Sequence, residues 1–588
     1  MLTTSADTFI GTELNDTFVG ASGTVADADI LIDQDADDND TANLTVTWAY
    51  TPTMITKIEN INLDWNAFGT ATFSLGGISG SDEITLTSNK LGFLGSANVT
   101  AGASKTITAG SGMDGTLTVT GTTTDVIVNG GEATVVSVTG TGAANVTAGS
   151  GTTSVTTSGY TTAVVDAGTA TTVSVTDARA SSNTTALTVN ADATITNGTT
   201  GALALTLSDG NAVTMNVIGA SLDVAGAGDV VINSTGLTGK TATNSKTDGT
   251  LTYVSSATTA QDVDAVAADL IKFTGNVNGA ITAANGANLE FAAATTATDI
   301  TVAGTGTSDV VNVTFSGATP TAAVLRLDGV ETLNLHAAAT AVTGTDFTVT
   351  ELVLGQPGTN QVVVTGSNDI SLGKITGSGT VDASAVTGTV TLVQYTSGGT
   401  LTMLGSSTAT NSATFTGTAS ASTYTGGSGN DTVVFANTAG AGVATATAIV
   451  GDGTNSVSAN ALTTGDLVVV GGTGNDTVNA AALTTGNVTA QLSDGNNAVT
   501  IGTAGSALNG ATVAVETGSG NDTLTIAGNV VAADNFTAML GSGANTVNIG
   551  GTVTGAATLN FTGGVGTDTL SVAAGTDLSG SGLVLTNF

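Results

Sequence analysis

Short glycine-rich phrases recur through the last third of the chain at nearly constant intervals. Three weaker copies alternate with four stronger ones and carry Asn455, Asn497 and Asn545 where the stronger copies carry Asp. Successive motifs lie about 21 to 25 positions apart, and a turn motif repeated at this period predicts one motif per coil of a parallel β-solenoid. The stronger copies are GGSGNDTVVF at 426–435, GGTGNDTVNA at 471–480, TGSGNDTLTI at 517–526 and GGVGTDTLSV at 563–572.

The same rhythm continues more faintly toward the N-terminus. GTLTV near 115, TVVSV near 134, TTSV near 152 and TTVSV near 171 recur about every 18 to 19 residues. Alternation such as Leu117 and Val119 turns one side of a strand toward a core, while the Thr between them faces solvent. The 80 Gly suit the corners. We therefore predict an all-β chain that forms an elongated right-handed parallel β-solenoid, β-helix- or β-roll-like, with coils of about 18–25 residues.

Disorder is disfavoured because 40% of the residues are hydrophobic and regularly spaced. The segment AQDVDAVAADLIKF at 260–273 places Val263, Val266 and Leu270 at helical intervals, so it is either a short helix or another irregular coil. We expect three segments: 1–64 as an N-terminal cap or assembly region, 65–350 as a Thr/Val-rich solenoid, and 351–588 as a solenoid with cation-binding turns.

The charge balance excludes several classes of partner. Acidic residues number 46 against 9 basic ones, which gives a formal net charge of −37 although only 9% of the residues are charged. Nucleic acid is therefore not an expected partner, since phosphate binding needs basic patches, and bare anionic lipid is disfavoured for the same reason. Carboxylates that repel one another in a compact chain need neutralisation, and divalent cations are the obvious candidates.

The sequence gives no sign of an N-terminal export signal or a membrane span. MLTTSADTF lacks a basic start followed by an apolar stretch, and no run of 18 apolar residues exists. There is no Cys, so disulfides and thiolate sites are absent. We expect a chain that is cytosolic, already processed, or exported by a route that reads another signal.

An inventory of reactive groups argues against catalysis. His336 is the only His, and HExxH, GxSxG and phosphate-loop motifs are absent. Paired carboxylates could cleave a glycosidic bond, but 2 Trp and 5 Tyr offer little surface for binding sugar. We therefore expect no enzyme activity, and a structural role for His336.

The Asp-bearing turns are the best candidate sites, because Gly-rich loops offer carbonyl oxygens and Asp adds a carboxylate, as calcium requires. GGSGND resembles the G-G-x-G-x-D-x-U-x nonapeptide of RTX proteins, which binds calcium in a β-roll. The motifs of this chain differ from RTX nonapeptides in spacing, because RTX nonapeptides run in tandem. The turns are therefore either weak calcium sites or corner turns without an ion. For the Asn copies we favour no ion. The resemblance implies metal ligands at Gly426, Gly427, Gly429, Asp431, Gly471, Gly472, Gly474, Asp476, Gly518, Gly520, Asp522, Gly563, Gly564, Gly566 and Asp568.

A second acidic cluster lies near the N-terminus, in ADADILIDQDADDND. It is either a solvated loop or part of a further metal site. The preceding echo, in which Asp-Thr-Phe at 7–9 returns at 16–18, looks like a degenerate RTX turn that caps the solenoid or meets a neighbouring subunit. The candidate metal ligands in this region are Asp7, Asp16, Asp33, Asp35 and Asp37.

The flanking phrases IENINL at 58–63 and VETLNL at 330–335 resemble Gly/Thr-rich bacterial surface-layer proteins and large adhesins exported by type I secretion. That resemblance implies an extracellular protein at the cell surface that self-assembles with calcium into a surface layer or filament. Its partners would be copies of itself, with lipopolysaccharide or glycans as further candidates. The alternative is a secreted adhesin or biofilm-matrix binding protein. An ice-binding face on patches such as TLTVTGTTT is a minor variant.

Overall fold

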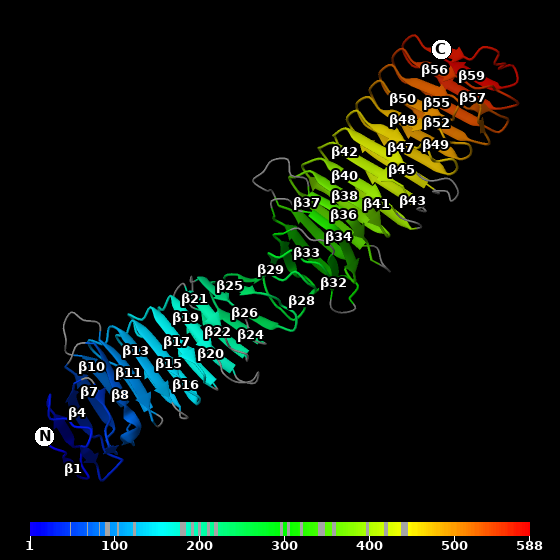
Figure 1. The fold of residues 1–588 in the computed structure, drawn as a ribbon. Coiled ribbons are helices and arrows are strands. Elements are labelled where there is room, and N and C mark those ends of the chain that lie inside the picture. Colours follow the sequence, from blue (N-terminus) through cyan, green and yellow to red (C-terminus); the bar gives the residue numbers. More distant parts are fainter. Residues whose placement is uncertain are drawn as a thin grey trace. The chain divides into compact units, whose positions relative to one another are not determined.

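The computed structural model shows an all-β parallel β-solenoid of about 23 turns, which confirms the fold predicted from the repeats (Figure 1). The strands of each unit stack coil upon coil, and the one short 3-10 helix among the described residues is η1 (Leu75–Gly77). The structure describes residues 1–588 apart from 48, 67–68, 82, 89–94, 103–104, 122–124, 161, 177–183, 190–192, 198–201, 208–211, 217–220, 294–297, 303–305, 318–320, 339–346, 356–359, 396–398, 417–420 and 437–444.

The chain divides into two compact units. Unit 1 comprises 1–256 and 265–271, and unit 2 comprises 257–264 and 272–588. Strand β29 (Leu270–Phe273) crosses the point of division. The segment boundaries predicted after residues 64 and 350 remain predictions.

Unit 1 holds three parallel sheets. Sheet A contains β1 (Thr8–Ile10), β3 (Ile30–Ile32), β6 (Met54–Thr56) and β9 (Ile78–Ser79). Sheet B contains β2 (Thr17–Gly20), β4 (Thr41–Val46), β7 (Asn60–Trp65), β10 (Glu83–Ser88), β12 (Lys105–Ala109), β14 (Val126–Asn129), β16 (Ala143–Thr147), β18 (Thr162–Asp166), β20 (Thr184–Val189), β22 (Ala202–Leu207), β24 (Ser221–Gly226) and β26 (Thr241–Lys246). The strands of sheet C in this unit are β5 (Ala49–Tyr50), β8 (Thr70–Ser74), β11 (Ser96–Ala101), β13 (Thr116–Gly121), β15 (Val135–Thr139), β17 (Ser154–Ser158), β19 (Thr172–Thr176), β21 (Ala193–Asn197), β23 (Ala212–Asn216), β25 (Asp229–Ser234) and β27 (Leu251–Ser255).

Unit 2 repeats the same plan. Its strands of sheet C are β31 (Asn288–Phe291), β33 (Val310–Phe315), β35 (Thr332–Ala337), β37 (Asn360–Gly366), β39 (Gly379–Val386), β41 (Thr400–Leu404), β43 (Ala421–Thr425), β45 (Thr445–Gly451), β47 (Asp466–Gly471), β49 (Asn487–Gln491), β52 (Thr512–Glu516), β55 (Asn535–Met539), β57 (Thr558–Thr562) and β59 (Gly582–Thr586). Sheet D contains β28 (Gln261–Asp262), β30 (Ile281–Ala283), β32 (Thr298–Val302), β34 (Thr321–Asp328), β36 (Phe347–Val353), β38 (Ile370–Thr376), β40 (Val390–Gln394), β42 (Asn411–Phe415), β44 (Asp431–Phe435), β46 (Ser456–Ser458), β48 (Thr477–Ala480), β50 (Ala498–Ile501), β53 (Thr523–Ile526), β56 (Thr546–Ile549) and β58 (Thr569–Val572). Strands β51 (Ala507–Leu508) and β54 (Asn529–Val530) form a separate pair.

The register of sheet D reproduces the predicted period. From β44 to β58, each strand of sheet D pairs in parallel with the following strand of the same sheet. Every pairing joins the residues that directly follow the Asp or Asn of successive sequence motifs. This row of paired residues is Thr432, Ser456, Thr477, Ala498, Thr523, Thr546 and Thr569. In unit 1, the pairing of β13, β15, β17 and β19 likewise follows the fainter rhythm of the sequence. One motif therefore corresponds to one coil.

The core runs along the coils of each unit and is built from alternating apolar side chains. Leu117 and Val119 are fully buried, whereas the Thr residues between and beside them are exposed or half-buried. In unit 2, Phe291 stacks on Phe273 and Phe315, with ring centroids 5.1 and 5.2 Å apart. Identical side chains of successive coils thus lie directly above one another, which lets each added coil extend the same core.

The short helix predicted as one alternative for 260–273 is wrong. The segment instead forms β28 and β29, and Val266 makes an isolated parallel bridge to Ala242. Val263 and Val266 are buried because they face the core from a coil turn. A helix-like spacing of three apolar residues therefore arose from an irregular coil, the other alternative.

Candidate cation-binding ladders

A column of Asp and Asn side chains runs along the start of the sheet D strands in unit 2. The backbone amide of each member donates a hydrogen bond to the side-chain oxygen of the member in the next coil. The bonds run from Asp431 to Asn455 (2.8 Å), Asn455 to Asp476 (3.3 Å), Asp476 to Asn497 (3.0 Å), Asn497 to Asp522 (2.8 Å), Asp522 to Asn545 (3.0 Å) and Asn545 to Asp568 (2.9 Å). We call this column the C-terminal ladder.

The Asn members satisfy both ends of their side chains. While the oxygen accepts from the preceding coil, the amide nitrogen of Asn455 donates to the carbonyl of Gly451 at 3.1 Å. Asn497 donates to the carbonyls of Ser493 and Gly495 at 3.0 and 3.2 Å. The carbonyl oxygens of these turns therefore lie around the side-chain amide nitrogen of each Asn member.

The Asp members place an oxygen where the Asn members place a donor. Asp431, Asp476 and Asp522 are each at most 2% exposed. One carboxylate oxygen, Oδ2, is buried without a hydrogen-bond partner among the described residues in Asp431, Asp476, Asp522 and Asp568. A buried polar atom without a partner costs about 1–3 kcal/mol. A cation or a proton would relieve that cost.

In three of the four strong motifs, the first glycine makes room for this oxygen, whereas Thr517 takes that position before Asp522. A Cβ atom at Gly426, Gly471 or Gly563 would overlap Oδ2 of the Asp five residues later. None of these three glycines has a positive φ, so their role is steric. The later Gly474, Gly520 and Gly566 do have positive φ and lie against the backbone of the neighbouring coil, so these positions use the backbone freedom of glycine.

Burial shifts the acidity of the ladder. It raises the pKa of Asp431 to about 6, against hydrogen bonds from Asn411 that favour the ionised form. Burial likewise raises the pKa of Asp476 to about 6 and raises the pKa of Asp522. Asp431 and Asp476 are therefore mainly ionised at neutral pH, at a cost that a bound cation would remove. This donor set fits an oxygen-preferring cation such as calcium.

A second ladder lies at the start of the first strands of sheet B in unit 1, and all its members are acidic. The amide of Asp16 donates to Oδ1 of Asp40 at 2.6 Å, and the amide of Asp40 donates to Oε2 of Glu59 at 2.8 Å. In sheet A, the amide of Asp7 similarly donates to Asp29 at 2.9 Å. We call Asp16, Asp40 and Glu59 the N-terminal ladder. It lacks the neutral spacers of the C-terminal ladder.

The structure brings together only some of the acidic residues predicted in this region. Asp16 and Asp33 lie together with Asp40, whereas Asp7, Asp35 and Asp37 belong to neither potential metal-binding group found among the described residues. Oδ1 of Asp35 accepts the backbone amides of Ala36 and Asp37, which shapes the turn.

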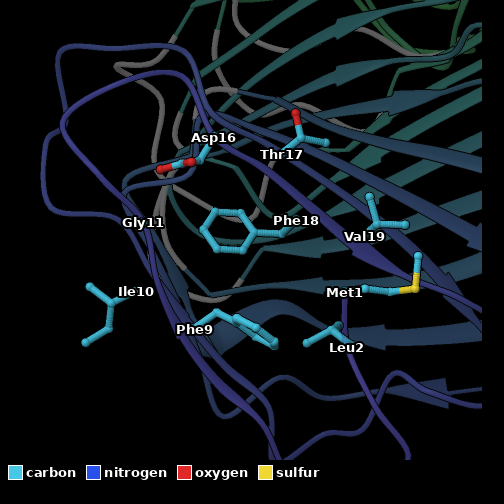
Figure 2. A pocket seen from close by; sticks show the side chains of 9 residues that line it. All are labelled: Met1, Leu2, Phe9, Ile10, Gly11, Asp16, Thr17, Phe18 and Val19. Atoms are coloured by element: carbon cyan, nitrogen blue, oxygen red, sulfur yellow. The ribbon is translucent and has the colours of Figure 1, made fainter.

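Asp16 also borders a pocket of about 190 Å³. Its carboxylate is turned away from the apolar side chains of Leu2 and Val19 (Figure 2). Among the described residues, Asp16 is the one ionisable side chain that lines this pocket, so the chemistry of this region lies with the carboxylates rather than with the pocket.

The members of these two acidic groups that were not predicted as ligands from the sequence are Asp38, Asp40 and Glu59. Asp38 and Asp40 were visible within the acidic run but were not distinguished from their neighbours. One signal was available, because Asp40-Thr41 repeats Asp16-Thr17 exactly one coil later, and the two Thr residues pair in sheet B.

Comparison with protein-family models, curated proteins and solved structures finds no match to this chain. The functional argument therefore depends on the geometry of the ladders.

Proposed function

We propose that the chain is a secreted structural protein of the bacterial cell surface that calcium stabilises and that assembles with copies of itself into a surface layer or filament. The observation that carries the proposal is the C-terminal ladder, with one unpartnered buried oxygen in each of its four Asp members. A fold that adds coils without changing its core suits a structural role.

Asp431, Asp476, Asp522 and Asp568 would hold the ions. Bound calcium supplies positive charge to oxygen ligands. Each ladder Asp already uses Oδ1 to accept an amide or side-chain nitrogen of the preceding coil, which fixes the orientation of its carboxylate and leaves Oδ2 free for an ion. Ion binding at one coil would thereby stabilise the connection to its neighbour.

The net charge of −37 explains why assembly would depend on a cation. Separate subunits with this charge repel one another, and neutralisation of carboxylates reduces the repulsion. We place assembly outside the cell, in keeping with the RTX and type I secretion resemblance. Within the part of the chain that the structure describes, no helix has the length and apolar character needed to cross a bilayer.

A non-enzymatic role is part of the same proposal. His336 lies exposed on β35, where its Nδ1 pairs with the hydroxyl of Thr365 at 2.9 Å. This pair joins neighbouring strands of sheet C, as a structural side chain would.

The proposal is tested by adding calcium to purified, chelator-treated full-length protein and following assembly by electron microscopy and light scattering. We expect ordered sheets or fibres with calcium and dispersed particles without it. The test variant changes Asp431→Asn, Asp476→Asn, Asp522→Asn and Asp568→Asn together, and it should lose most of the calcium response of unfolding.

The matched control removes four exposed charges instead, through Glu13→Gln, Asp248→Asn, Asp328→Asn and Glu516→Gln, and should keep that response. Identical unfolding of the wild-type protein with calcium and with chelator would refute calcium stabilisation. Dispersed wild-type particles at every calcium concentration would favour the adhesin alternative.

A further inference from the structure

Five carboxylates from the first three coils of sheet B and their turns form two overlapping groups. Asp16, Asp33 and Asp40 make one group, and Asp38, Asp40 and Glu59 make the other. Within each group, one carboxylate oxygen from each residue lies within 4.8 Å of those of the other two residues. Two oxygens bound to the same calcium ion lie no more than about 5 Å apart, so this spacing is compatible with shared coordination. Asp40 belongs to both groups.

Buried oxygens without partners point into the cluster. Asp33 is 1% exposed and Asp40 is completely buried, yet Oδ1 of Asp33 and Oδ2 of Asp40 have no hydrogen-bond partner among the described residues. Both carboxylate oxygens of Asp38 are also shielded and unpartnered. The other oxygens of Asp33 and Asp40 are occupied, since they accept the amides of Asp35 and Asp16 at 2.6 Å.

Gly11 keeps the space around these oxygens open. A Cβ atom at position 11 would overlap Oδ1 of Asp33 and would lie 2.9 Å from Oδ2 of Asp16. The backbone of Gly11 is held in place by the carbonyl of Ile32, which accepts its amide at 2.7 Å, and by Gln34, which donates to its carbonyl. The surrounding turns therefore preserve a gap lined by carboxylates.

None of the ion pairs formed between described residues involves any of the five carboxylates. The ammonium group of nearby Lys57 donates to the carbonyl of Gln34 at 2.7 Å. Burying several like charges without counter-ions is strongly unfavourable, so the cluster needs positive charge from elsewhere.

We propose that Asp16, Asp33, Asp38, Asp40 and Glu59 form a binding site for a hard divalent cation of the calcium class. The ion connects three successive coils, with Asp40 as the central ligand. This inference shares its cation with the proposed function but none of its residues, because the C-terminal ladder lies in unit 2. Carboxylate ligands without thiolate or imidazole favour calcium over zinc or copper.

The test is calcium titration by calorimetry of the full-length chain in which the four ladder Asp of unit 2 are already changed to Asn. We expect this variant to keep a saturable calcium-binding component. Adding Asp40→Asn should weaken that component at least tenfold, whereas adding Asp37→Asn, an exposed control in the same segment, should change it less than twofold.

Two results would overturn the site. One is the absence of saturable binding in the unit 2 variant up to about 10 mM calcium, well above the range of weak extracellular sites. The other is equal loss of affinity in Asp40→Asn and Asp37→Asn, which would indicate a diffuse surface charge effect. Loss of all binding in the unit 2 variant would leave the C-terminal ladder supported, so the two proposals fail separately.

Hydrogen exchange of the wild-type protein gives a measurement that does not depend on a variant's folding. Calcium should slow the exchange of the amides of Asp16 and Asp40 and of strands β2 and β4. Unchanged exchange in these strands at saturating calcium would contradict the site.

Discussion

The two ladders use the same backbone connection but differ in how they manage charge. In the C-terminal ladder, Asp and Asn alternate, so each ladder Asp has neutral Asn side chains as its ladder neighbours, and their amide nitrogens donate to the turn carbonyls. In the N-terminal ladder, Asp16, Asp40 and Glu59 follow one another, and Asp33 and Asp38 add to the charge. The connection itself needs only a side-chain oxygen. Negative charge is therefore not required for the hydrogen-bonded connection. It is spaced out by Asn in the C-terminal ladder and concentrated in the N-terminal ladder.

The largest effect should come from filling the space that both ladders keep open. Gly471→Ala places a methyl group against Oδ2 of Asp476, and Gly11→Ala places one against Asp33 and Asp16. Overpacking that displaces a buried carboxylate should lower the free energy of unfolding by about 2–4 kcal/mol in each case, measured by denaturant titration. Gly550→Ala is the control, because the nearest atom to its new Cβ lies at 3.8 Å and its φ is not positive. Equal effects at 471 and 550 would contradict the steric role.

A smaller effect should follow from converting one kind of ladder into the other. Asn497→Asp would create an unbroken run of three carboxylates, because Asp476 and Asp522 flank this position in the ladder. It would also remove the bonds from the Asn497 amide nitrogen to Ser493 and Gly495. In chelator at pH 7.5, the change should destabilise the protein by about 1–3 kcal/mol, and calcium should recover most of the loss.

Asp476→Asn is the reciprocal change. It supplies a donor to the turn and should stabilise the chelator-treated protein by about 1–3 kcal/mol while reducing its calcium response. Thermal unfolding with and without calcium measures both variants. Destabilisation by Asp476→Asn in chelator would show that its Oδ2 is not an unfavourable buried group.

The smallest predicted effect is a pH dependence. The folded-state pKa of Asp431 and Asp476 is about 6, above the ordinary value of 3.8. Protonation of these groups therefore favours folding; their contribution is fully present below about pH 4 and is lost as the pH rises through 6. In chelator, stability should fall by about 1 kcal/mol between pH 5 and 7, after allowance for solvent screening. Calcium should abolish this fall, and the fourfold Asp→Asn variant should lack it.

The sequence was sufficient to predict the solenoid and, between residues 431 and 568, the length of its coils. Each motif interval from 431 to 568 recurs as a strand register, because the Asp or Asn at the start of a strand must stand above its equivalent in the next coil. The irregular coil at 260–273 was ambiguous, since three apolar residues entering a core from a turn can imitate helical spacing. Periodicity identifies regular coils better than irregular ones.

The candidate site was only partly predictable. The Asp of each strong motif lies in the C-terminal ladder, and the Asn copies form its alternate members, as their alternation along the sequence indicated. Glu59 was missed because it departs from the motif and reaches Asp40 only through a coil connection of 19 residues. The first glycine was predicted as a metal ligand, whereas in three of the four strong motifs it leaves space for the carboxylate of the Asp five residues later. Such roles depend on side-chain positions that the linear pattern does not contain.

The direction of the ladder bonds has a consequence for how the solenoid is completed. In every bond of the C-terminal ladder from Asp431 to Asp568, the amide belongs to the earlier coil and the accepting side chain to the later one. A stack of coils therefore has chemically distinct ends, one offering acceptors and the other offering donors. A coil can therefore continue the ladder only if it has the same orientation as the coil before it, so the polarity of the ladder bonds fixes the direction in which the coils stack.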